Sequence, residues 1–598
     1  MSNDDKKAEG IKRKVDRRAF LLAAGAGAIS ASVPGATAQA AMRGKWDAEA
    51  DVVVVGSGAA AGAAASKALQ MGCSVIVIEK SPVWGGTTAK SGGVAWIPNN
   101  SYMRKKGLQD PRDDSIRLMA RCSYPSKYRS GDKHFGLSDL EYDLLATYYD
   151  RGSVVIDELD AMGALKSQMV ADDQGNPAFF DYSGNLPENK APQGRAVFPV
   201  YKKGVSPGLD MTLQLRDFIS KKGGKILLGH RAVSAIVNNS GQVIGVEVQT
   251  TDGKTKSIRA RRGLVFGSGG FTHNENYRNN FLRGPIFGGC AVPTNEGDFI
   301  GIAGALGAQM GNLNNAWWGQ VVVEQALQTP SVGWLVFVQP GKSLFTVNRH
   351  GRRVGDEQMM YNERTQSHFV WDPDRYEFSN RVQFMIFDQA TRDENAGWYP
   401  IPAAGAGAPY LLQSDSLEGL AIEISQRLLK LAPQIGNIEL APNFMANLRE
   451  TESRFAAFAT KGVDADFSRG NNTAGLLASA GKLMGALTFQ KKTLGDVADK
   501  YDTGVPNDSM RALSKTGPYY AILLGAGTLD TKGGPRINAK AQVLDGKGQP
   551  IRGLYGAGNC IASPAAAAYW SGGATIGTAL AFGYIAGEQA ASSAPIAA

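Results

Sequence analysis

Two glycine-rich stretches near the C-terminus hold the residues with the clearest chemistry, residues 553–559 (GLYGAGN) and 569–577 (YWSGGATIG). A glycine-rich helix start presents backbone N–H groups that carry partial positive charge and polarise a carbonyl. The phenol of Tyr569 can donate a hydrogen bond to the same oxygen that the N–H of Gly573 would reach. The two donors together predict an oxyanion-type site.

A second group of residues, near the start of the chain, predicts a dinucleotide site. Residues 51–55 (DVVVV) form a continuous apolar run, which is the pattern of a strand buried on both faces. A glycine turn at 56–61, a helix of small residues and a second strand at 74–78 follow, and Glu79 ends that strand. This order is the βαβ fingerprint, in which Ala61 occupies the third glycine position.

Each member of this fingerprint has a physical role. Gly56 permits the tight turn, Gly58 lets a pyrophosphate approach the backbone, and Glu79 binds ribose hydroxyls. Residues 84–93 (WGGTTAKSGG) add a second glycine loop directly after the acid, which is typical of proteins that bind FAD. The loop residues expected to contact the phosphates and the flavin edge are Gly85, Gly86, Thr87, Thr88, Ser91, Gly92 and Gly93.

More distant segments are expected to complete the cofactor site. Short strands at 225–228, 231–237 and 242–250 lead to residues 263–271 (GLVFGSGGF), and residues 553–559 return to the same region. The cofactor contacts predicted from these segments are Val233, Gly558, Asn559, Thr575 and Ile576. We therefore expect FAD, bound non-covalently, as the cofactor.

The resulting fold prediction is α/β, with a discontinuous Rossmann-like FAD-binding domain and an inserted α+β catalytic domain. The FAD-binding domain covers 45–310 and 515–598, within which 97–210 is a largely helical elaboration. The catalytic domain covers 311–514 and caps the site, which is expected between the two domains.

Composition excludes several other classes of protein. The four cysteines are widely spaced and form no Cys-x-x-Cys pair, so we expect no zinc ribbon, iron–sulfur cluster or attached haem, and no metal site. The formal net charge is +9, of which residues 1–40 contribute +3 from seven basic and four acidic residues. No basic block interleaved with aromatics follows, so a nucleic-acid partner is not expected.

The N-terminus predicts a transport signal. Arg17 and Arg18 precede a weakly apolar run, and residues 38–40 (AQA) resemble a cleavage site. This pattern resembles a twin-arginine signal over 1–40, with export to the periplasm or the extracellular face; the alternative is a disordered basic tail. The apolar run is too short to cross a bilayer core of ~30 Å. No other run predicts a transmembrane helix, although peripheral membrane contact stays open.

Five motifs carry a resemblance to a known family: residues 85–100, 347–353, 531–534, 553–559 and 569–577. The chain resembles the flavoprotein family of fumarate reductases and 3-ketosteroid dehydrogenases over essentially its whole length after the signal. Fumarate-reducing members grip a dicarboxylate with arginines and a histidine. Residues 527–534 (GTLDTKGG) here contain no histidine, and residues 562–573 contain no arginine. The resemblance therefore favours a neutral ketone over a dicarboxylate as substrate.

The 3-ketosteroid Δ1-dehydrogenase branch is the better match. That branch uses three tyrosines, and the resemblance places them at Tyr182, Tyr361 and Tyr569, the last acting with Gly573. The sequence departs from the usual pattern at Trp570 and Ser571, where proline and glycine are common. A second departure is at 354–357 (VGDE), where Phe-x-Asn-Glu is common. We expect Trp570 to reshape the cavity near the substrate carbonyl.

The resemblance implies desaturation next to a ketone. Tyr569 and Gly573 would stabilise the enolate, and losing one such donor typically lowers the rate by ~10²–10³. Tyr361 would remove the α-proton, and Tyr182 would relay or share it. The β-hydride would pass to the flavin, and an external acceptor, a quinone or a redox carrier, would reoxidise it. The alternatives are an enone or fumarate-type reductase and a non-catalytic flavin electron carrier.

Overall fold

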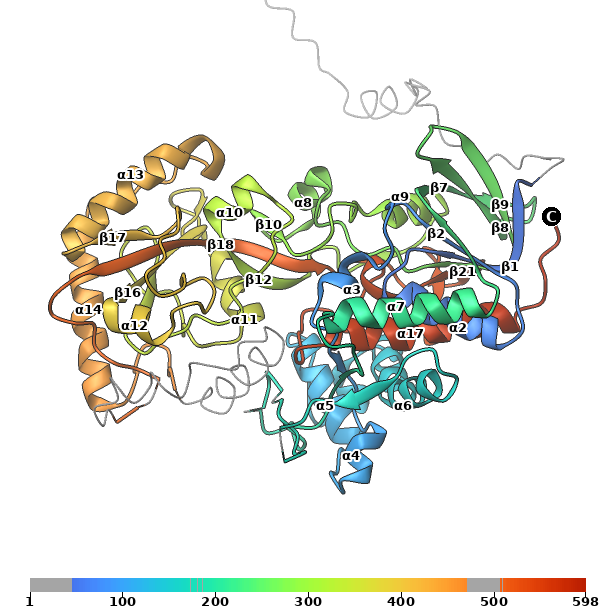
Figure 1. Cartoon of the computed structure of the whole chain (residues 1–598), viewed down its shortest axis with the longest axis horizontal. Coiled ribbons are helices and arrows are strands. Elements are labelled where there is room, and N and C mark those ends of the chain that lie inside the picture. Colours follow the sequence, from blue (N-terminus) through green and yellow to red (C-terminus); the bar gives the residue numbers. More distant parts are fainter. Residues whose placement is uncertain (1–45, 173, 180, 185, 471–505, 508) are drawn as a thin grey trace, which may run out of the picture. The chain divides into compact units, whose positions relative to one another are not determined.

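The computed structural model describes residues 46–172, 174–179, 181–184, 186–470, 506–507 and 509–598. The twin-arginine signal predicted over 1–40 lies outside the described residues. Within them, two sheets and the helices around them form the parts of the molecule that matter for the site (Figure 1).

The first sheet carries the predicted dinucleotide motif. Its strands are β1 (Ala48–Val55), β2 (Val75–Glu79), β6 (Lys225–Leu228), β7 (His230–Val237), β8 (Val243–Thr250), β9 (Thr255–Phe266), β20 (Gln542–Leu544) and β21 (Pro550–Gly556). β1 lies between β2 and β9 and pairs with both in parallel, and β21 joins in parallel on the far side of β9. The central residues of β1, Val52, Val53 and Val54, are fully buried, as a strand covered on both faces requires.

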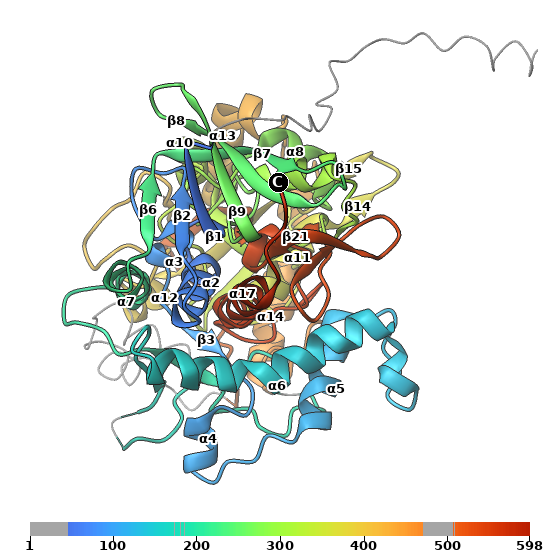
Figure 2. The ribbon, with the colours of Figure 1, turned by 90° about the vertical axis from the view of Figure 1, so that its right-hand side faces the viewer.

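Three helices pack against one face of this sheet, α2 (Ala59–Gln70), α7 (Pro207–Lys221) and α17 (Ala574–Ser592). A fourth helix, α6 (Asp139–Ala161), crosses them on the side away from the sheet (Figure 2). The contact between α2 and α17 is close because glycine lies on α17. A Cβ at Gly583 would lie 2.2 Å from the carbonyl oxygen of Ala60. The N-terminus of α17, which begins directly after Gly573, is held at the edge of the nucleotide-binding motif by this packing.

Helices and a small sheet cover the region that the sequence predicts as a helical elaboration. It contains α4 (Ser101–Lys105), α5 (Arg112–Ser123), η1 (Lys133–Gly136), α6, and the strands β4 (Ser167–Met169) and β5 (Ala196–Pro199). β3 (Ala95–Trp96), just before this region, pairs with β5 and completes the small sheet. Arg195, which is buried, forms ion pairs with Asp110 and Asp181. These ion pairs fix the segment that leads to Tyr182.

The second sheet comes from the middle of the chain. Its strands are β10 (Gly288–Gly289), β12 (Ala316–Val322), β13 (Leu344–Val347), β16 (Val382–Asp388), β17 (Leu412–Ser414) and β18 (Tyr519–Thr531). The long strand β18 is the axis of this sheet and pairs with β10, β12, β16 and β17. The helices of this part include α11 (Tyr361–Gln366), α13 (Leu417–Ile435) and α14 (Phe444–Lys461), and the last two bury a separate apolar core (Figure 1).

Short elements complete the described chain. They are α3 (Gly86–Lys90), α8 (Glu275–Phe281), α9 (Asp298–Ala305), α10 (Val323–Gln328), η2 (Ser367–Phe369), α12 (Gln389–Glu394), η3 (Gly558–Cys560), β11 (Met310–Gly311), β14 (Trp371–Asp372), β15 (Glu377–Phe378) and β19 (Gly534–Pro535). All strands of the second sheet fall between β9 and β20 of the first, so the predicted α/β fold with an insertion is confirmed. The domain boundaries given above stay a prediction.

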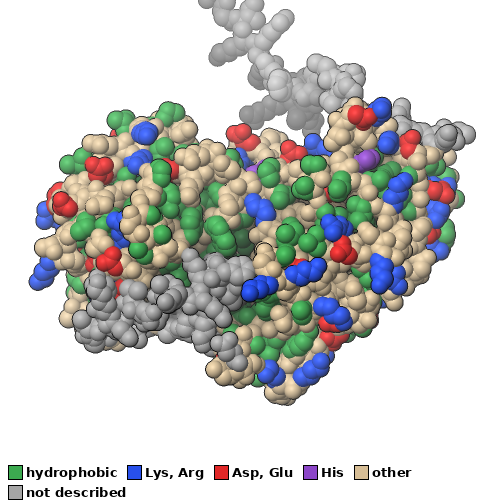
Figure 3. All heavy atoms as spheres, viewed as in Figure 1, with side chains coloured by type: hydrophobic (Ala, Val, Ile, Leu, Met, Phe, Trp, Pro, Cys, Tyr) green, Lys and Arg blue, Asp and Glu red, His purple; other side chains and the backbone are tan. Residues whose placement is uncertain are grey.

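Within the described residues, no helix is long and apolar enough to cross a membrane. Figure 3 shows that positive and negative side chains are interspersed on the face it displays.

Candidate active site

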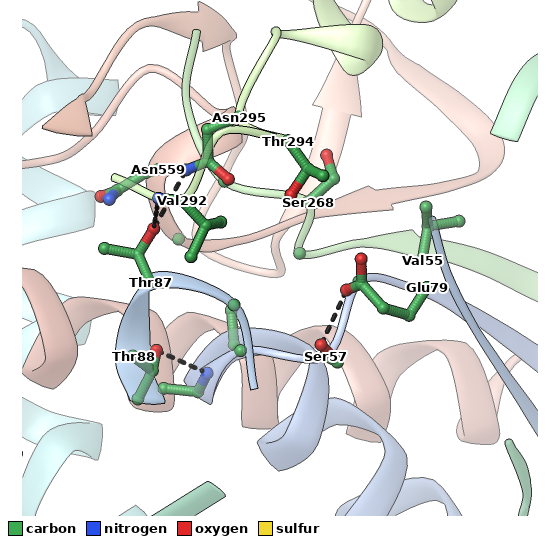
Figure 4. Close-up of a pocket in the computed structure, with 18 of the residues that line it drawn as sticks. Val55, Ser57, Glu79, Thr87, Thr88, Ser268, Val292, Thr294, Asn295 and Asn559 are labelled. Carbon is green, nitrogen blue, oxygen red and sulfur yellow. Dashed lines mark hydrogen bonds between the residues drawn. The ribbon is translucent and has the colours of Figure 1, made fainter. Parts of the chain in front are cut away.

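A narrow cavity of about 90 Å³, here called the dinucleotide cavity, lies where β1 and β2 end (Figure 4). Glycines make much of its wall: Gly56, Gly58, Gly86, Gly267, Gly269 and Gly558. Backbone exposed in this way can approach a pyrophosphate, and α2 begins at the same place with its partially positive N-terminus.

The turn at Gly56 cannot hold a larger residue. Its φ of +109° lies in a region that residues with a side chain rarely adopt, and a Cβ there would lie 2.4 Å from the carbonyl oxygen of Gly267. Thr88 closes the other side of the turn, because its Oγ1 accepts a hydrogen bond from the N–H of Ala59 at 3.1 Å. The shape and donors of the cavity therefore fit a dinucleotide diphosphate.

Glu79 lies at the end of β2 and faces this cavity (Figure 4). Its carboxylate accepts a hydrogen bond from Ser57 Oγ at 2.7 Å and another from the N–H of Ser81 at 2.8 Å. Burial raises the pKa of Glu79, and these hydrogen bonds oppose the increase. The carboxylate keeps further acceptor capacity, which suits ribose hydroxyls.

A second cavity of about 310 Å³, here called the tyrosine cavity, adjoins the first. Its wall is mostly apolar and includes Phe179, Trp334, Phe337 and Val338. Residues from both predicted domains line it. The residues that line both cavities are Thr87, Thr88, Asp530, Asn559, Thr575 and Ile576. A group that begins at the diphosphate and ends among these six residues would reach the tyrosine cavity.

Three tyrosines meet in the wall of the tyrosine cavity. The ring centroids of Tyr182 and Tyr361 are 5.4 Å apart, those of Tyr182 and Tyr569 are 5.4 Å apart, and those of Tyr361 and Tyr569 are 5.6 Å apart. All three pairs meet edge to face, and the hydroxyl oxygens of Tyr182 and Tyr361 are 3.0 Å apart. Residues separated by up to 387 positions in sequence (569 − 182) thus share one hydrogen-bonding centre.

Burial raises the pKa of each phenol. The pKa values of Tyr182 and Tyr361 lie well above the ordinary value, and burial is the largest cause in both. Burial also raises the pKa of Tyr569, where hydrogen bonds with Tyr361, Thr575 and the backbone of Gly573 act in the opposite direction. All three side chains are therefore neutral hydrogen-bond donors at neutral pH.

Separate elements position the three phenols. Tyr361 begins α11, which is tied to β12 by a hydrogen bond of 3.0 Å from the N–H of Trp318 to Asn362 Oδ1. Tyr182 follows Asp181, whose carboxylate accepts from the indole N–H of Trp96 at 2.6 Å. Gly573 adopts φ +97° as the N-cap of α17, so the helix begins beside Tyr569.

The comparisons with known proteins agree with this geometry. A family model described as "FAD binding domain" matches residues 51–576. The chain belongs to this FAD-binding family. The flavoprotein is 30% identical to a 3-oxosteroid 1-dehydrogenase of Mycolicibacterium smegmatis, over 91% of this chain and 98% of that protein. It is 29% identical to a 4-oxocyclohexanecarboxylate 2-dehydrogenase of Sinomonas cyclohexanicum, over 91% and 93%.

Among solved structures, one similar protein is a 3-ketosteroid Δ1-dehydrogenase from Sterolibacterium denitrificans in complex with 1,4-androstadiene-3,17-dione. The TM-score is 0.71 and the identity 25%, and the match covers 91% of the flavoprotein and 99% of that chain. These findings confirm FAD as the cofactor and an FAD-dependent oxidoreductase as the class of enzyme.

The structure brings most of the residues predicted from the sequence to the two cavities. Those that line at least one are Gly56, Gly58, Glu79, Gly86, Thr87, Thr88, Ser91, Gly92, Gly93, Tyr182, Tyr361, Gly558, Asn559, Tyr569, Gly573, Thr575 and Ile576. Ala61 and Gly85 lie behind the wall: a Cβ at Gly267 would be 2.7 Å from the Ala61 nitrogen, and the N–H of Gly85 donates to Ser57 Oγ at 2.9 Å.

Two sequence expectations differ from the structure. Val233 is 42% exposed and lines neither cavity, whereas its neighbour Ala232 lines the dinucleotide cavity. The pairing of β7 with β8 shifts register between Ala232 and Ser234, so Val233 is the extra residue of a bulge. Trp570 does not line the tyrosine cavity either. It packs against Trp96 and donates its indole N–H to Ser123 Oγ at 3.0 Å.

Asp530 is a site residue that the sequence analysis did not select. It is 1% exposed, lies near the end of β18, and lines both cavities. Its carboxylate accepts hydrogen bonds from five donors, which are the N–H groups of Gly270 and Thr531, the amides of Asn295 and Asn559, and the hydroxyl of Thr272. Because every one of these partners donates, they stabilise the ionised carboxylate against the burial that raises its pKa. The sequence feature that could have identified Asp530 is an acidic residue in the stretch 527–534, where the resemblance places a histidine in fumarate-reducing members of the family.

Lys532 is a second residue that was missed. Its side chain is fully buried, and burial lowers its pKa well below the ordinary value. Its Nζ lies 4.1 Å from the ring centroid of Trp317 and donates to the carbonyl oxygen of Ala568 at 2.5 Å. Trp317 in turn packs against Tyr569, with ring centroids 5.0 Å apart. Lys532 therefore supports the backbone and the ring that hold Tyr569.

Proposed function

We propose that the flavoprotein desaturates a cyclic ketone, such as a 3-ketosteroid, by introducing a C=C bond next to the carbonyl. The observation that carries this proposal is the meeting of Tyr182, Tyr361 and Tyr569 in an apolar cavity that shares a wall with the dinucleotide cavity. An apolar wall suits a ring system, and convergent phenols suit the proton chemistry of a ketone.

The ketone oxygen is the first group that the site has to bind. The phenol of Tyr569 and the N–H of Gly573 are its donors in this proposal, and the partially positive N-terminus of α17 lies at the same place. As the α-proton leaves, negative charge develops on this oxygen. Each donor then becomes stronger in the transition state than in the ground state, and removing one typically costs ~10²–10³ in rate.

Tyr361 is the acceptor of the α-proton. Its hydroxyl lies 3.0 Å from that of Tyr182, so a proton can pass between the two phenols. Their raised pKa values mean that the phenolate needed as base is scarce at neutral pH. The reaction is therefore expected to accelerate as the pH rises.

Bound FAD supplies the acceptor for the hydride that leaves the β-carbon. The residues for its ring end are the six that line both cavities, and those for its diphosphate are the glycines of the dinucleotide cavity. Thr575 and Ile576 belong to the first turn of α17, where the helix dipole stabilises negative charge. Each turnover removes one proton and one hydride from substrate, so a two-electron acceptor outside the protein is required.

The location and the acceptor are part of the same proposal. The twin-arginine pattern over 1–40 supports export to the periplasm or the extracellular face. A quinone or a soluble redox carrier would then collect the electrons there, and peripheral contact with a membrane would bring the enzyme to a quinone.

The test is turnover of ketones by the purified holoenzyme with phenazine methosulfate as acceptor. The proposal expects desaturation of androst-4-ene-3,17-dione or of a simpler cyclohexanone, with dye reduction matching product. Failure on every ketone, combined with reduction of enones or fumarate by reduced dye, would favour the reverse, reductase activity. A flavin that only exchanges electrons with dyes, equally well in wild type and in Tyr361→Phe, would indicate an electron carrier.

A further inference from the structure

Each turnover leaves a proton on the phenols of the tyrosine cavity, and that proton has to reach water before the next one. Tyr361, the proposed base, is only 4% exposed. The hydroxyl of Tyr182, 3.0 Å away, is the group to which it can pass the proton. A proton shared by these two phenols needs a further acceptor that water can reach.

A third cavity, of about 280 Å³, adjoins the segment that carries Tyr361. Met360 and Tyr361 line the tyrosine cavity, whereas Met359, Glu363 and Arg364 line the third cavity. The segment 359–364 therefore forms part of the wall of both cavities. The polar side chains of the third cavity include Gln339, Thr346, Asp356, Ser367 and Gln383. A cavity of this size with several polar partners suits water.

Glu363 joins the two cavities. It lies in the first turn of α11, two positions after the proposed base (Figure 1). Its side chain is exposed to water and lines the third cavity, and its Oε1 accepts a hydrogen bond from Asn362 Nδ2 at 2.9 Å. Glu357 in the same wall is held by two arginines, whereas Glu363 forms no ion pair with a described residue. Its carboxylate is therefore free to accept a proton and to release it.

The charge of Glu363 acts on the tyrosine centre. Burial is the largest cause of the raised pKa of Tyr182, and the negative charge of Glu363 adds to it. The same charge adds to burial in raising the pKa of the Cys122 thiol. Burial also raises the pKa of Glu363 itself, and interaction with Lys532 opposes the increase. A proton that moves from Tyr182 to Glu363 neutralises the carboxylate and so removes its repulsion of the phenolate.

We propose that Glu363 relays the proton from the two phenols to water in the third cavity. The α-proton taken up by Tyr361 moves to Tyr182 as the Tyr182 proton passes to a carboxylate oxygen of Glu363 and then to water. Tyr361 is left as the phenolate, and one proton has left for the one taken from substrate. Asp181, the other carboxylate beside Tyr182, is buried in an ion pair with Arg195 and offers no exit. The relay rests on the proposed function and adds a residue to its proton chemistry.

Three variants of the holoenzyme test the relay with the ketone that the wild type turns over fastest. Glu363→Gln removes the carboxylate, Glu363→Asp keeps it, and Glu423→Gln changes an exposed glutamate of α13 as the control. We expect Glu363→Gln to lower kcat by about tenfold or more, because general acid–base groups typically contribute ~10²–10⁴. Glu363→Asp should keep most of the rate. FAD content, and calorimetric affinity of the oxidised enzyme for the desaturated product, should stay at the wild-type level in all three.

Two further readouts separate proton transfer from a structural role. The solvent deuterium isotope effect on kcat should increase in Glu363→Gln, because release of the proton becomes slow, and formate, a small carboxylate, should restore part of the rate. An unchanged kcat in Glu363→Gln would overturn the relay. So would a loss that formate does not restore and that Glu363→Asp shares, with weaker binding of product. A wild-type enzyme that turns over no ketone would instead count against the proposed function.

Discussion

The two cavities are built in different ways. Backbone forms most of the dinucleotide cavity: glycines at 56, 58 and 86 come from one continuous motif, and Gly267 and Gly558 come from strand ends beside it. Side chains form the tyrosine cavity, and they come from segments near residues 182, 334–361 and 569. A backbone-built site depends on the absence of side chains at fixed spacing, whereas a side-chain-built site depends on the whole tertiary fold. The difference predicts that mutations in the two cavities fail in distinguishable ways.

Gly56→Val is expected to have the largest effect, on the dinucleotide cavity. The required φ of +109° and the 2.4 Å approach of a Cβ to Gly267 leave no room for a side chain, so FAD binding should be lost and activity with it. The measurement is flavin absorbance per protein after gel filtration. The control is Gly72→Ala, where φ is +80° but nothing lies within 4 Å of the added Cβ. It should cost ~1–2 kcal/mol of stability and keep FAD. Normal FAD content in Gly56→Val would contradict the assignment.

Tyr361→Phe should impair the reaction in the tyrosine cavity and leave FAD binding in the dinucleotide cavity unchanged. It removes the proposed base without changing the packing of the ring, so kcat should fall by ~10²–10⁴ while FAD content stays at the wild-type level. Steady-state assays and anaerobic bleaching of the flavin by substrate measure the two effects. Tyr376→Phe serves as the matched control, because Tyr376 is 82% exposed. A fall of less than tenfold would mean that another group accepts the proton.

These contrasts explain how much the sequence could predict. Residues 51–55 were expected as a buried strand and lie in β1, and the turn, helix and acid follow as expected, because each is set by local spacing. Val233 and Trp570 were misplaced for tertiary reasons, a β-bulge in one case and a pocket formed by Trp96 and Tyr148 in the other. Neither the bulge nor the pocket has a signature in the local sequence.

The three tyrosines show what could not be predicted from the spacing of residues in the sequence. No spacing in the chain connects Tyr182, Tyr361 and Tyr569, so only the resemblance to a family could group them before the structure did. Asp530 was passed over because a single charged residue acquires meaning only from the cavity that it faces. Such a residue can be identified only once the tertiary structure shows which cavity it lines.

The pH dependence sharpens the assignment of the tyrosine cavity. The proposed base is the Tyr361 phenolate. Burial holds the pKa values of Tyr182 and Tyr361 well above the ordinary value, so the reactive fraction should rise with pH throughout the range in which the enzyme is assayed. We expect kcat/KM to rise up to tenfold per pH unit between pH 7 and 9. The rise should be absent in Tyr361→Phe. A wild-type rate that is flat or falls over this interval would assign the proton to a group of lower pKa.

Asp530→Asn tests the wall that the cavities share, and its effect should be the smallest. The ionised carboxylate lies where the ring end of FAD is expected, so it opposes the extra negative charge of the reduced cofactor. Removing that charge should raise the two-electron reduction potential of the bound flavin, by about 30 mV for each ~1.4 kcal/mol of lost repulsion. Equilibration with dyes of known potential measures the shift, and Asp113→Asn, an 80% exposed carboxylate, is the control.

Whether the reduction potential rises or stays unchanged decides what Asp530 does. Asparagine cannot accept from all five donors, so a purely structural carboxylate would show itself as weaker FAD binding with the potential unchanged. A raised potential with FAD retained would instead mean that the carboxylate keeps the flavin a weaker oxidant, which eases transfer of electrons to the external acceptor. In that case the shared wall does more than hold the cofactor: it sets how the chemistry of the tyrosine cavity is coupled to reoxidation.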